Sequence, residues 1–501
     1  MTASPTDSSF FDVVVVGAGL SGVAAGHYLQ TQCPTRSYVI LENRQAIGGT
    51  WDLFRYPGVR SDSDMFTLGY SFRPWESDAS FANGPDIRAY VNATARDEGI
   101  DRHIRFGHRV TSAAWDGRQA RWSVSASLTA PGEATREVHF SCRFLFFCSG
   151  YYNYEQGHEP PWPGRESFGG RIVHPQHWPA GLDYSQRKVV VVGSGATAVT
   201  LVPDMAATAA HVTMLQRSPS YIVALPAHDR IGALLRRWLP NRLSHPLIRW
   251  KNIVLASAFY QFSRRRPATV RRLILRQAAR LLGPGFDVQR HLAPSYQPWD
   301  QRLCIAPDAD LFRAVREGKA DIVTGQIECF TPTGIRLASG QEIAADVIVT
   351  ATGLELKVLG GAALSVDGVA VDFSKTVIYR GAMFSGVPNM AVASGYTNAS
   401  WTLKCELVAR YVCRLLNEMQ AHQLEVCVPV NDDPQLPTQA FLDLSSGYVQ
   451  RSAHLLARQG LRRPWRMYQN YLLDLLVLRF SPLRDGVLRF SAKPASGEPR
   501  D

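Results

Sequence analysis

The sequence has no apolar stretch long enough to cross a membrane and no segment typical of a secretory leader. A spanning helix needs about 20 consecutive apolar residues, and no such window occurs. The first ten residues contain neither Lys nor Arg, and the apolar run Val13–Val16 leads straight into glycines, which is typical of a strand. A cytoplasmic protein is therefore expected. With 46% hydrophobic and 19% charged residues, the 501-residue chain has the composition of an ordinary globular protein of two or three domains.

Closely spaced cysteines are also absent. The eight cysteines are scattered, and none forms a C-x-x-C pair: Cys33, Cys142, Cys148, Cys304, Cys329, Cys405, Cys413 and Cys427. This scatter gives no support to structural zinc, an iron–sulfur cluster or a dithiol redox centre, so no metal site is expected. Buried free thiols are the expected state of these residues.

One long stretch contains no acidic residue at all. Between Ile231 and Phe286 there is no Asp or Glu, and the twelve cations there are enough to account for the whole net charge of +11. These cations are Arg236, Arg237, Arg242, Arg249, Lys251, Arg264, Arg265, Arg266, Arg271, Arg272, Arg276 and Arg280. Apolar residues recur at helical spacing through the same stretch, which predicts two or three amphipathic helices.

This basic stretch allows more than one interpretation. The simplest is the solvated face of a lid. A peripheral contact of 231–286 with anionic lipid is the alternative, because Leu234, Trp238, Leu247 and Trp250 interleave with the cations, as interfacial helices require. Binding to nucleic acid is not expected, since no groove-reading motif accompanies the charge.

Two segments repeat one pattern. A β-branched run, Asp12–Val16 in one case and Lys188–Val192 in the other, leads into a glycine-rich turn and then into a helical stretch. Each run reads as a strand buried on both faces. The pattern predicts an α/β fold with two doubly wound dinucleotide-binding, Rossmann-like domains. We expect the basic stretch to form an inserted helical subdomain.

The first glycine-rich turn carries the full dinucleotide fingerprint. Gly17 permits the tight turn, Gly19 lets the backbone approach a pyrophosphate, and Gly22 lets helix and strand pack closely. The helix start supplies backbone N–H groups, including that of Ser21, to the phosphates. Glu42 ends the next predicted strand, at the spacing of the acid that binds ribose hydroxyls. This site is predicted to bind an adenosine with a free 2′-hydroxyl, as in FAD; the alternative is a plain glycine-rich turn.

The second turn differs at the place of the acid. Its predicted cofactor-binding residues are Gly193, Ser194, Gly195, Ala196, Thr197 and Ala198, followed by Arg217 and Ser218 at the end of the next strand. Glu would repel a 2′-phosphate there, whereas Arg can bind one with two hydrogen bonds. The second site is therefore predicted to bind NADP(H). The alternative for Arg217 is a solvated surface arginine.

The order of these segments predicts discontinuous domains. The FAD domain is expected at 8–150 and 353–501, the NADP domain at 151–218 and 296–352, and the helical insert at 219–295. Residues 115–128 and 137–147 read as strands of an antiparallel insertion. The buried run 346–353 reads as the return to the first domain, and a helix is expected at 403–419. Two dinucleotide units suggest a flavoprotein that takes hydride from a nicotinamide; a disulfide reductase would need a dithiol pair, which the sequence lacks.

Two longer motifs point to a family. Residues 48–62 contain Gly48-Gly49-Thr50-Trp51, Tyr56-Pro57-Gly58 and Asp62, and residues 168–179 contain Phe168, Gly170, His174, Trp178 and Pro179. The second set resembles the F-x-G-x-x-x-H-x-x-x-W-P fingerprint of type I Baeyer–Villiger monooxygenases, which are class B flavoprotein monooxygenases. The chain is similar to this family over nearly its whole length and looks closest to the ethionamide-activating branch.

The resemblance implies a function and a site. The enzyme would use FAD, NADPH and O2 to convert ketones into esters or lactones, and would also oxidise thioethers or thioamides; an S- or N-oxygenating enzyme without ketone activity is the alternative. Its substrate would be a small apolar ketone or organosulfur compound, and neither the individual substrate nor the oligomeric state is indicated.

Particular residues are assigned by the same resemblance. Arg302 and Asp62 would be catalytic, with Asp62 also near the flavin. His174 is assigned to the catalytic residues because it belongs to the fingerprint at 168–179. A His before a Pro is, however, more often structural. The resemblance implies that this motif links the cofactor domains. The cofactor-binding residues implied are Gly49, Thr50, Trp51, Arg60 and Val110. Gln301 departs from the Lys that many relatives carry, which leaves Arg217 as the main support for NADPH.

A fixed guanidinium suits this chemistry. It can stabilise a negatively charged oxygen species on the reduced flavin, as a preorganised donor does for other oxyanions. Arg stays protonated at any working pH, so it does not neutralise that charge by giving up a proton. The alternative for Arg302 is a structural ion pair.

Overall fold

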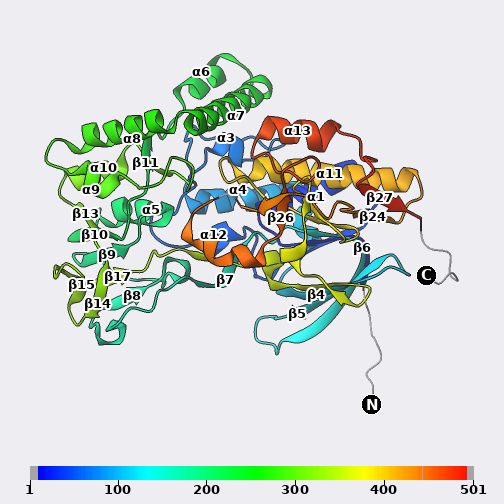
Figure 1. Ribbon diagram of the computed structural model, residues 1–501, viewed down its shortest axis with the longest axis horizontal. Coiled ribbons are helices and arrows are strands. Elements are labelled where there is room, and N and C mark those ends of the chain that lie inside the picture. The colour runs from blue at the N-terminus through cyan, green and yellow to red at the C-terminus, as the bar shows by residue number, and fades with distance from the viewer. Residues whose placement is uncertain (1–8, 443, 493–501) are drawn as a thin grey trace.

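The structure is a computed structural model that describes residues 9–442 and 444–492 (Figure 1). The first eight residues and the last nine lie outside this range, so the predicted outer limits of the FAD domain are not described. In the described ranges, no helix combines the length and the apolar character needed to cross a membrane. All eight cysteines are unpaired; seven are buried and Cys329 is half-buried.

The first unit is built on a nine-stranded mixed sheet. Its order is β20-β19-β4-β5-β6-β1-β2-β3, with β23 also paired to β6. The strands are β1 (Ser9–Val16), β2 (Tyr38–Leu41), β3 (Ile104–Arg105), β4 (His108–Asp116), β5 (Arg121–Leu128), β6 (Arg136–Phe147), β19 (Ala363–Val366), β20 (Val369–Ala370) and β23 (Met390–Val392). Strands β3, β2, β1, β6 and β23 run parallel, whereas β4, β5 and β6 form an antiparallel meander.

The valines of β1 explain why the sheet is covered on both faces. Val13 and Val15 belong to one hydrophobic core, and Val14 and Val16 belong to another. Successive strand side chains point to opposite faces, so an unbroken apolar run requires a covering layer on each side. Helices supply one layer: α1 (Leu20–Gln32) packs on α11 (Trp401–Ala421).

The second unit is a five-stranded parallel sheet in the order β13-β10-β9-β17-β8. Its strands are β8 (Arg171–Val173), β9 (Lys188–Val192), β10 (His211–Gln216), β13 (Ala320–Thr324) and β17 (Val347–Val349), and its helices are α5 (Ala196–Met205) and α10 (Asp310–Arg316). The run 346–353 was expected to return the chain to the first unit. It contains β17, which pairs with β8 and β9 and completes the second sheet. The two doubly wound α/β units are therefore confirmed, and the chain leaves the second only after β17.

A narrow ribbon connects the two units. Strands β7 (Tyr152–Gly157) and β18 (Leu354–Leu356) are antiparallel partners and carry the chain into the second unit and out of it. In Figure 1, β7 lies between the two sheets. Both crossings therefore run side by side.

The basic stretch forms the expected helices. They are α6 (Arg230–Trp238), α7 (Asn241–Arg265) and α8 (Pro267–Leu282), followed by the short α9 (Val288–Leu292). They lie between β11 (Ile222–Leu225) and β12 (Cys304–Pro307), which pair in parallel. Figure 1 shows α6, α7 and α8 along one edge of the molecule, with α13 (Tyr471–Phe480) beside them.

The remaining elements complete the surface and the ends of the sheets. They are the helices α2 (Thr50–Leu53), α3 (Met65–Leu68), α4 (Gly84–Asp97) and α12 (Gly447–Ser452), and the strands β14 (Ile327–Thr331), β15 (Gly334–Leu337), β16 (Glu342–Ala344), β21 (Ile378–Tyr379), β22 (Met383–Phe384), β24 (Val426–Pro429), β25 (Thr438–Ala440), β26 (Arg458–Gly460) and β27 (Leu488–Ser491). The strand expected at 115–128 is in fact two, because Asp116-Gly117 begins a turn that Ala120 ends with a φ of 51°.

Candidate active site

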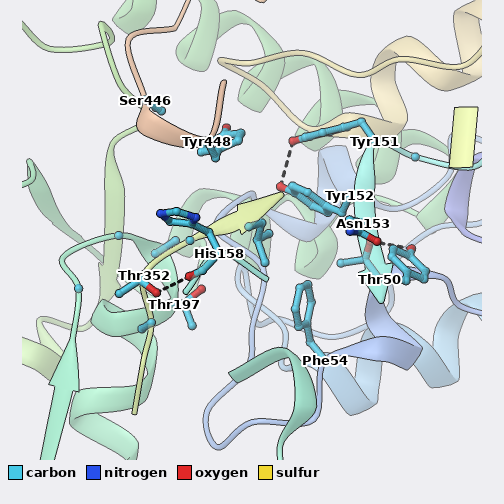
Figure 2. Close-up of a pocket in the computed structure, with 18 of the residues that line it drawn as sticks. Thr50, Phe54, Tyr151, Tyr152, Asn153, His158, Thr197, Thr352, Ser446 and Tyr448 are labelled. Carbon is cyan, nitrogen blue, oxygen red and sulfur yellow. Dashed lines mark hydrogen bonds between the residues drawn. The ribbon is translucent and has the colours of Figure 1, made fainter. Parts of the chain in front are cut away.

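A cavity of about 980 Å³ lies between the two units. Both glycine-rich turns line it, as do the motif 48–62, the start of β7, and Arg302. Its volume is at the top of the usual range of small-molecule sites, roughly 300–1,000 Å³. Figure 2 shows side chains from the first unit, the linking ribbon and the C-terminal segment pointing into one space.

The first glycine-rich turn is shaped for close approach of a ligand. Gly17 has a φ of 102°, and Gly19 is the residue before α1, where no side chain caps the free N–H groups. A Cβ on Gly22 would lie 1.9 Å from the carbonyl oxygen of Gly17, so helix and strand pack there as the fingerprint predicts. Gly17, Gly19 and Ser21 line the cavity. Uncapped N–H groups at a helix start bind phosphate, so the turn fits a pyrophosphate.

Glu42 lies at the end of β2, against this turn. Its Oε2 accepts a hydrogen bond from the backbone N–H of Ala18 at 2.7 Å, and its Oε1 accepts one from that of Arg44 at 2.8 Å. Burial raises the pKa of Glu42 above its ordinary value. Each carboxylate oxygen can accept a second hydrogen bond. Glu42 lines the cavity, so the fixed carboxylate fits a ribose with free hydroxyls.

The segment with Gly49, Thr50 and Trp51 is held by a buried carboxylate. Asp52 on α2 is 3% exposed and forms ion pairs with three arginines, Arg44, Arg55 and Arg88, at 2.6–2.8 Å. The network fixes α2 so that Gly49, Thr50 and Trp51 line the cavity. Val110 of β4 also lines it and is 6% exposed, beside a register shift in the β4–β5 pair.

The second glycine-rich turn leaves open space where a nucleotide would lie. Gly193 has a φ of 144°, and a Cβ on Gly195 would meet no atom within 4 Å. Residues 193–197 line the cavity, whereas Ala198 is fully buried and packs α5 onto the sheet. The Oγ of Ser194 donates to the carbonyl oxygen of Ser218 at 3.0 Å, which ties the turn to the end of β10.

Arg217 has the exposure that the second site requires. Both Arg217 and Ser218 are exposed and line the cavity. Among the residues that the structure describes, no acid forms an ion pair with Arg217. Its guanidinium is therefore free to bind an anion.

Arg302 faces the cavity and is held by Asp62. The Nε of Arg302 lies 2.8 Å from Oδ2 of Asp62, and its Nη2 donates to Oδ1 at 3.0 Å and to Oγ of Ser63 at 3.3 Å. Burial opposes the charge, but Asp62 and three tyrosines outweigh it, so the pKa of Arg302 rises above its ordinary value. The structure thus brings together Arg302 and Asp62, 240 residues apart in sequence.

Three tyrosines that the motifs did not single out surround this pair. The hydroxyls of Tyr151 and Tyr152 form one hydrogen bond with each other at 3.0 Å. Tyr448 of α12 lines the same cavity. Figure 2 shows all three directed toward one another. Burial raises the pKa of each hydroxyl. The position of Tyr151 and Tyr152 directly after Gly150, at the carboxyl end of β6, is a signal that could have identified them; Tyr448 has no such signal.

Arg60 connects the two units. Its Nη1 pairs with Oδ2 of Asp310 at 2.5 Å, and both side chains are largely buried. Asp310 begins α10 of the second unit, while Arg60 belongs to the motif 48–62. Arg60 also lines the cavity. The pair therefore fixes the spacing of the two units at the site.

His174 is not brought to the Arg302 cluster. It does not line the cavity but packs against the linking ribbon, where a Cβ on Gly157 would lie 2.0 Å from its ring. Its Nδ1 accepts from the backbone N–H of Gln176 at 3.2 Å. Burial lowers the pKa of His174 more than Glu159 raises it, so the ring is neutral at pH 7. His174 therefore lies where the chain passes between the two units, and this position suits a structural role in linking them.

The chain resembles known proteins over most of its length. Residues 11–275 match the family model described as flavin-binding monooxygenase-like. The chain is 52% identical to a protein of Mycobacterium tuberculosis (strain ATCC 25618 / H37Rv) named FAD-containing monooxygenase EthA, over 97% of this chain and 98% of the relative.

Solved structures share the fold. One described as oxidized steroid monooxygenase bound to NADP superposes with a TM-score of 0.74 at 21% identity, over 97% of this chain and 100% of that one. Another, OTEMO in complex with FAD and NADP, gives a TM-score of 0.68 at 21% identity, over 85% of this chain and 88% of that one. These likenesses confirm the fold class of two dinucleotide-binding units.

Proposed function

The chain belongs to the flavin-binding monooxygenase-like family, and on that premise we propose that it is an FAD- and NADPH-dependent Baeyer–Villiger monooxygenase. It inserts one oxygen atom of O2 into small apolar ketones to give esters or lactones, and also oxidises thioethers or thioamides. One observation carries this proposal: the guanidinium of Arg302, aligned by Asp62, faces the cavity onto which both glycine-rich turns open.

FAD is assigned to the first unit. The uncapped start of α1 and the close approach at Gly19 suit its pyrophosphate, and Glu42 suits its ribose. The relative at 52% identity is named as FAD-containing, which supports the same assignment. Thr50 and Trp51 would then lie against the flavin, as the family fingerprint implies.

NADPH is assigned to the second unit. Gly195 leaves room for the pyrophosphate at the start of α5, and the free, exposed guanidinium of Arg217 suits the 2′-phosphate. Gln301 lines the cavity without a charge, so Arg217 and Ser218 carry the preference for NADPH over NADH.

When bound, the two cofactors supply hydride and an oxygen atom activated from O2. The chain's own residues then act on charge and position. Nε and Nη2 of Arg302 are occupied by Asp62, whereas Nη1 has no hydrogen-bond partner among the described residues. The free Nη1 can donate to an oxygen atom that becomes negatively charged as the substrate carbonyl is attacked. The two contacts with Asp62 keep the guanidinium of Arg302 from rotating. The positive charge of Arg302 in turn balances the negative charge of Asp62.

The tyrosines hold protons near this centre. Because burial raises the pKa of Tyr151, Tyr152 and Tyr448, each keeps its proton at neutral pH. Their hydroxyls can therefore donate hydrogen bonds to a substrate oxygen, while their rings exclude water from the space around Arg302. Tyr151 also packs on Trp401, with ring centroids 4.9 Å apart.

Product analysis tests the proposal. The purified protein, saturated with FAD, is incubated in air with NADPH and either a cyclic ketone or an aryl thioether, and the products are identified by gas chromatography. Lactone and sulfoxide are both expected, each with matching consumption of NADPH. Sulfoxide without lactone would identify an S-oxygenating enzyme. If neither substrate stimulates NADPH consumption, the protein binds flavin without turnover. Either result refutes the proposal.

A further inference from the structure

The exposed apolar side chains are concentrated on one side of the molecule. Among the residues that the structure describes, nineteen large apolar residues are exposed, and thirteen of them lie on α6, α7 and α13. Trp238 at the end of α6 is 73% exposed and Phe480 at the end of α13 is 64% exposed. Single exposed apolar residues are ordinary, but a contiguous group marks a surface that binds something.

These three helices form one face, which we call the apolar face. On α7, Leu243, Leu247, Trp250 and Val254 recur every three or four residues and are all exposed, so they line one side of the helix. Trp250 contacts Tyr471 of α13, with ring centroids 5.8 Å apart. α6 packs on α7. Figure 1 shows α6, α7 and α13 on the same edge.

The cations of the basic stretch divide into two groups. Five of the twelve hold the helices in place, and the buried pair of Arg249 with Glu406 on α11, at 2.7 Å, is the deepest of them. Arg236 pairs with Asp78 and Arg264 with Asp300, Lys251 pairs with Asp229, and Arg271 donates to the hydroxyl of Tyr221. The other seven are exposed, and no acid among the described residues pairs with them.

The seven unpaired arginines lie on α6, on α7 and at its C-cap, and on α8, which packs on α7. Arg272, Arg276 and Arg280 recur every fourth residue on α8, so they form a cationic stripe along one side of that helix. Arg237 lies over the ring of Trp238 at the end of α6. Helices that combine an apolar side, tryptophan and unpaired arginines bind at the surface of an anionic bilayer.

We propose that the apolar face and the seven unpaired arginines bind peripherally to a membrane that contains anionic lipid. Trp238, Leu247 and Phe480 enter the boundary between headgroups and acyl chains, and the α8 stripe binds lipid phosphates. A second copy of the chain fits this face poorly, because a symmetric contact would set arginines against arginines with no acid between Ile231 and Phe286 to pair them. The face includes α13, more than 180 residues beyond the basic stretch.

Vesicle flotation tests the proposal with the full chain. Purified protein is mixed with vesicles of phosphatidylcholine alone or with phosphatidylglycerol added, and the floated fraction is measured against lipid concentration. We expect binding to the anionic vesicles and little to the neutral ones. Replacing Arg272, Arg276 and Arg280 by Gln should weaken binding about a hundredfold, since each surface cation contributes roughly fivefold. The double variant Trp238→Ser/Phe480→Ser should weaken it at least tenfold.

Matched variants separate the face from general effects. Arg118→Gln/Arg136→Gln removes exposed charges from the β4–β5–β6 meander, and Val369→Ser removes an exposed apolar side chain from β20. These controls should bind vesicles like the wild type. Far-UV circular dichroism and thermal unfolding of every variant report folding without reference to flavin or turnover.

Three outcomes would overturn the proposal. The first is a wild-type chain that does not float with anionic vesicles. The second is equal loss of binding in the face variants and the meander controls. The third is a stable dimer in analytical ultracentrifugation that Trp238→Ser/Phe480→Ser dissociates, because that result assigns the face to a second copy of the chain.

Discussion

Replacing Arg302 by Ala tests the centre of the site most directly. The change removes the guanidinium that Asp62 holds with contacts of 2.8 and 3.0 Å and leaves Asp62 facing the cavity unpaired. Loss of one preorganised donor at a developing oxyanion costs roughly 3–4 kcal/mol of transition-state stabilisation. At about 1.36 kcal/mol for each tenfold change, kcat/KM for ester formation should fall roughly 150- to 900-fold. Arg302→Lys should lose nearly as much, because an ammonium cannot pair with both oxygens of Asp62.

The assay measures lactone formation by gas chromatography and NADPH consumption by absorbance in the same reaction. Flavin content should stay at the wild-type level, because the hydrogen bonds of Arg302 go to Asp62 and Ser63 and none goes to the turn at Gly17–Gly22. Arg264→Ala is the matched control: it removes an exposed ion pair with Asp300, two residues before Arg302, and should change kcat/KM less than about threefold. Ester formation by Arg302→Ala within threefold of the wild type would refute the role assigned to the guanidinium.

Three further predictions follow from other parts of the structure. Gly195→Ala should unfold at the wild-type temperature, because its Cβ meets no protein atom within 4 Å, yet should raise the KM for NADPH at least tenfold by filling the nucleotide space, as steady-state kinetics would measure. Arg217→Ala should raise the KM for NADPH roughly ten- to hundredfold and leave that for NADH unchanged, because a charged hydrogen bond contributes about 1.5–3 kcal/mol. Burial, with Arg249 nearby, lowers the pKa of His245 to about 4. Between pH 6.5 and about 4 the unfolded chain therefore binds one more proton at this residue than the folded chain, so the stability of the fold decreases as the pH falls through this window. The variant His245→Asn should lose less stability over the same window, as thermal unfolding would measure.

Each of these predictions can fail on its own. A Gly195→Ala protein that unfolds at a much lower temperature contradicts the open space at the turn. Equal effects of Arg217→Ala on both nicotinamides contradict a 2′-phosphate contact, and Arg187→Ala, an exposed arginine outside the cavity, is the control. A His245→Asn protein with the same acid sensitivity as the wild type places the titrating groups elsewhere.

Local patterns in the sequence predicted the elements around the two glycine-rich turns well. The runs Val13–Val16 and Lys188–Val192 became central parallel strands, because an apolar run without alternation is stable only when a sheet is covered on both faces. The strand expected at 115–128 was wrong as one element, since it spans the turn between β4 and β5. The buried run at 346–353 contains β17, which belongs to the second sheet, and it is followed by β18 in the ribbon that returns to the first unit.

The resemblance to the family predicted Arg302 and Asp62 as site residues, but only the fold shows that their side chains touch. His174 belongs to the fingerprint at 168–179, yet its ring packs on the linking ribbon at Gly157 and does not line the cavity. Tyr448 lies on a short C-terminal helix with no motif, so nothing local pointed to its place beside Arg302. Residues distant in sequence meet through packing, which local patterns do not encode.

The sequence by itself determined the two glycine-rich turns, because glycine spacing and the residue at the end of the next strand act over about 25 residues. It also determined the helical character and the charge of the basic stretch. Only the tertiary structure decided which of those arginines pair inside the fold and which stay free, and that α13 joins α7 in one apolar face. The physical reason is that burial and pairing depend on partners brought close by folding: Glu406 neutralises Arg249 from 157 residues away, and no local pattern could assign that partner.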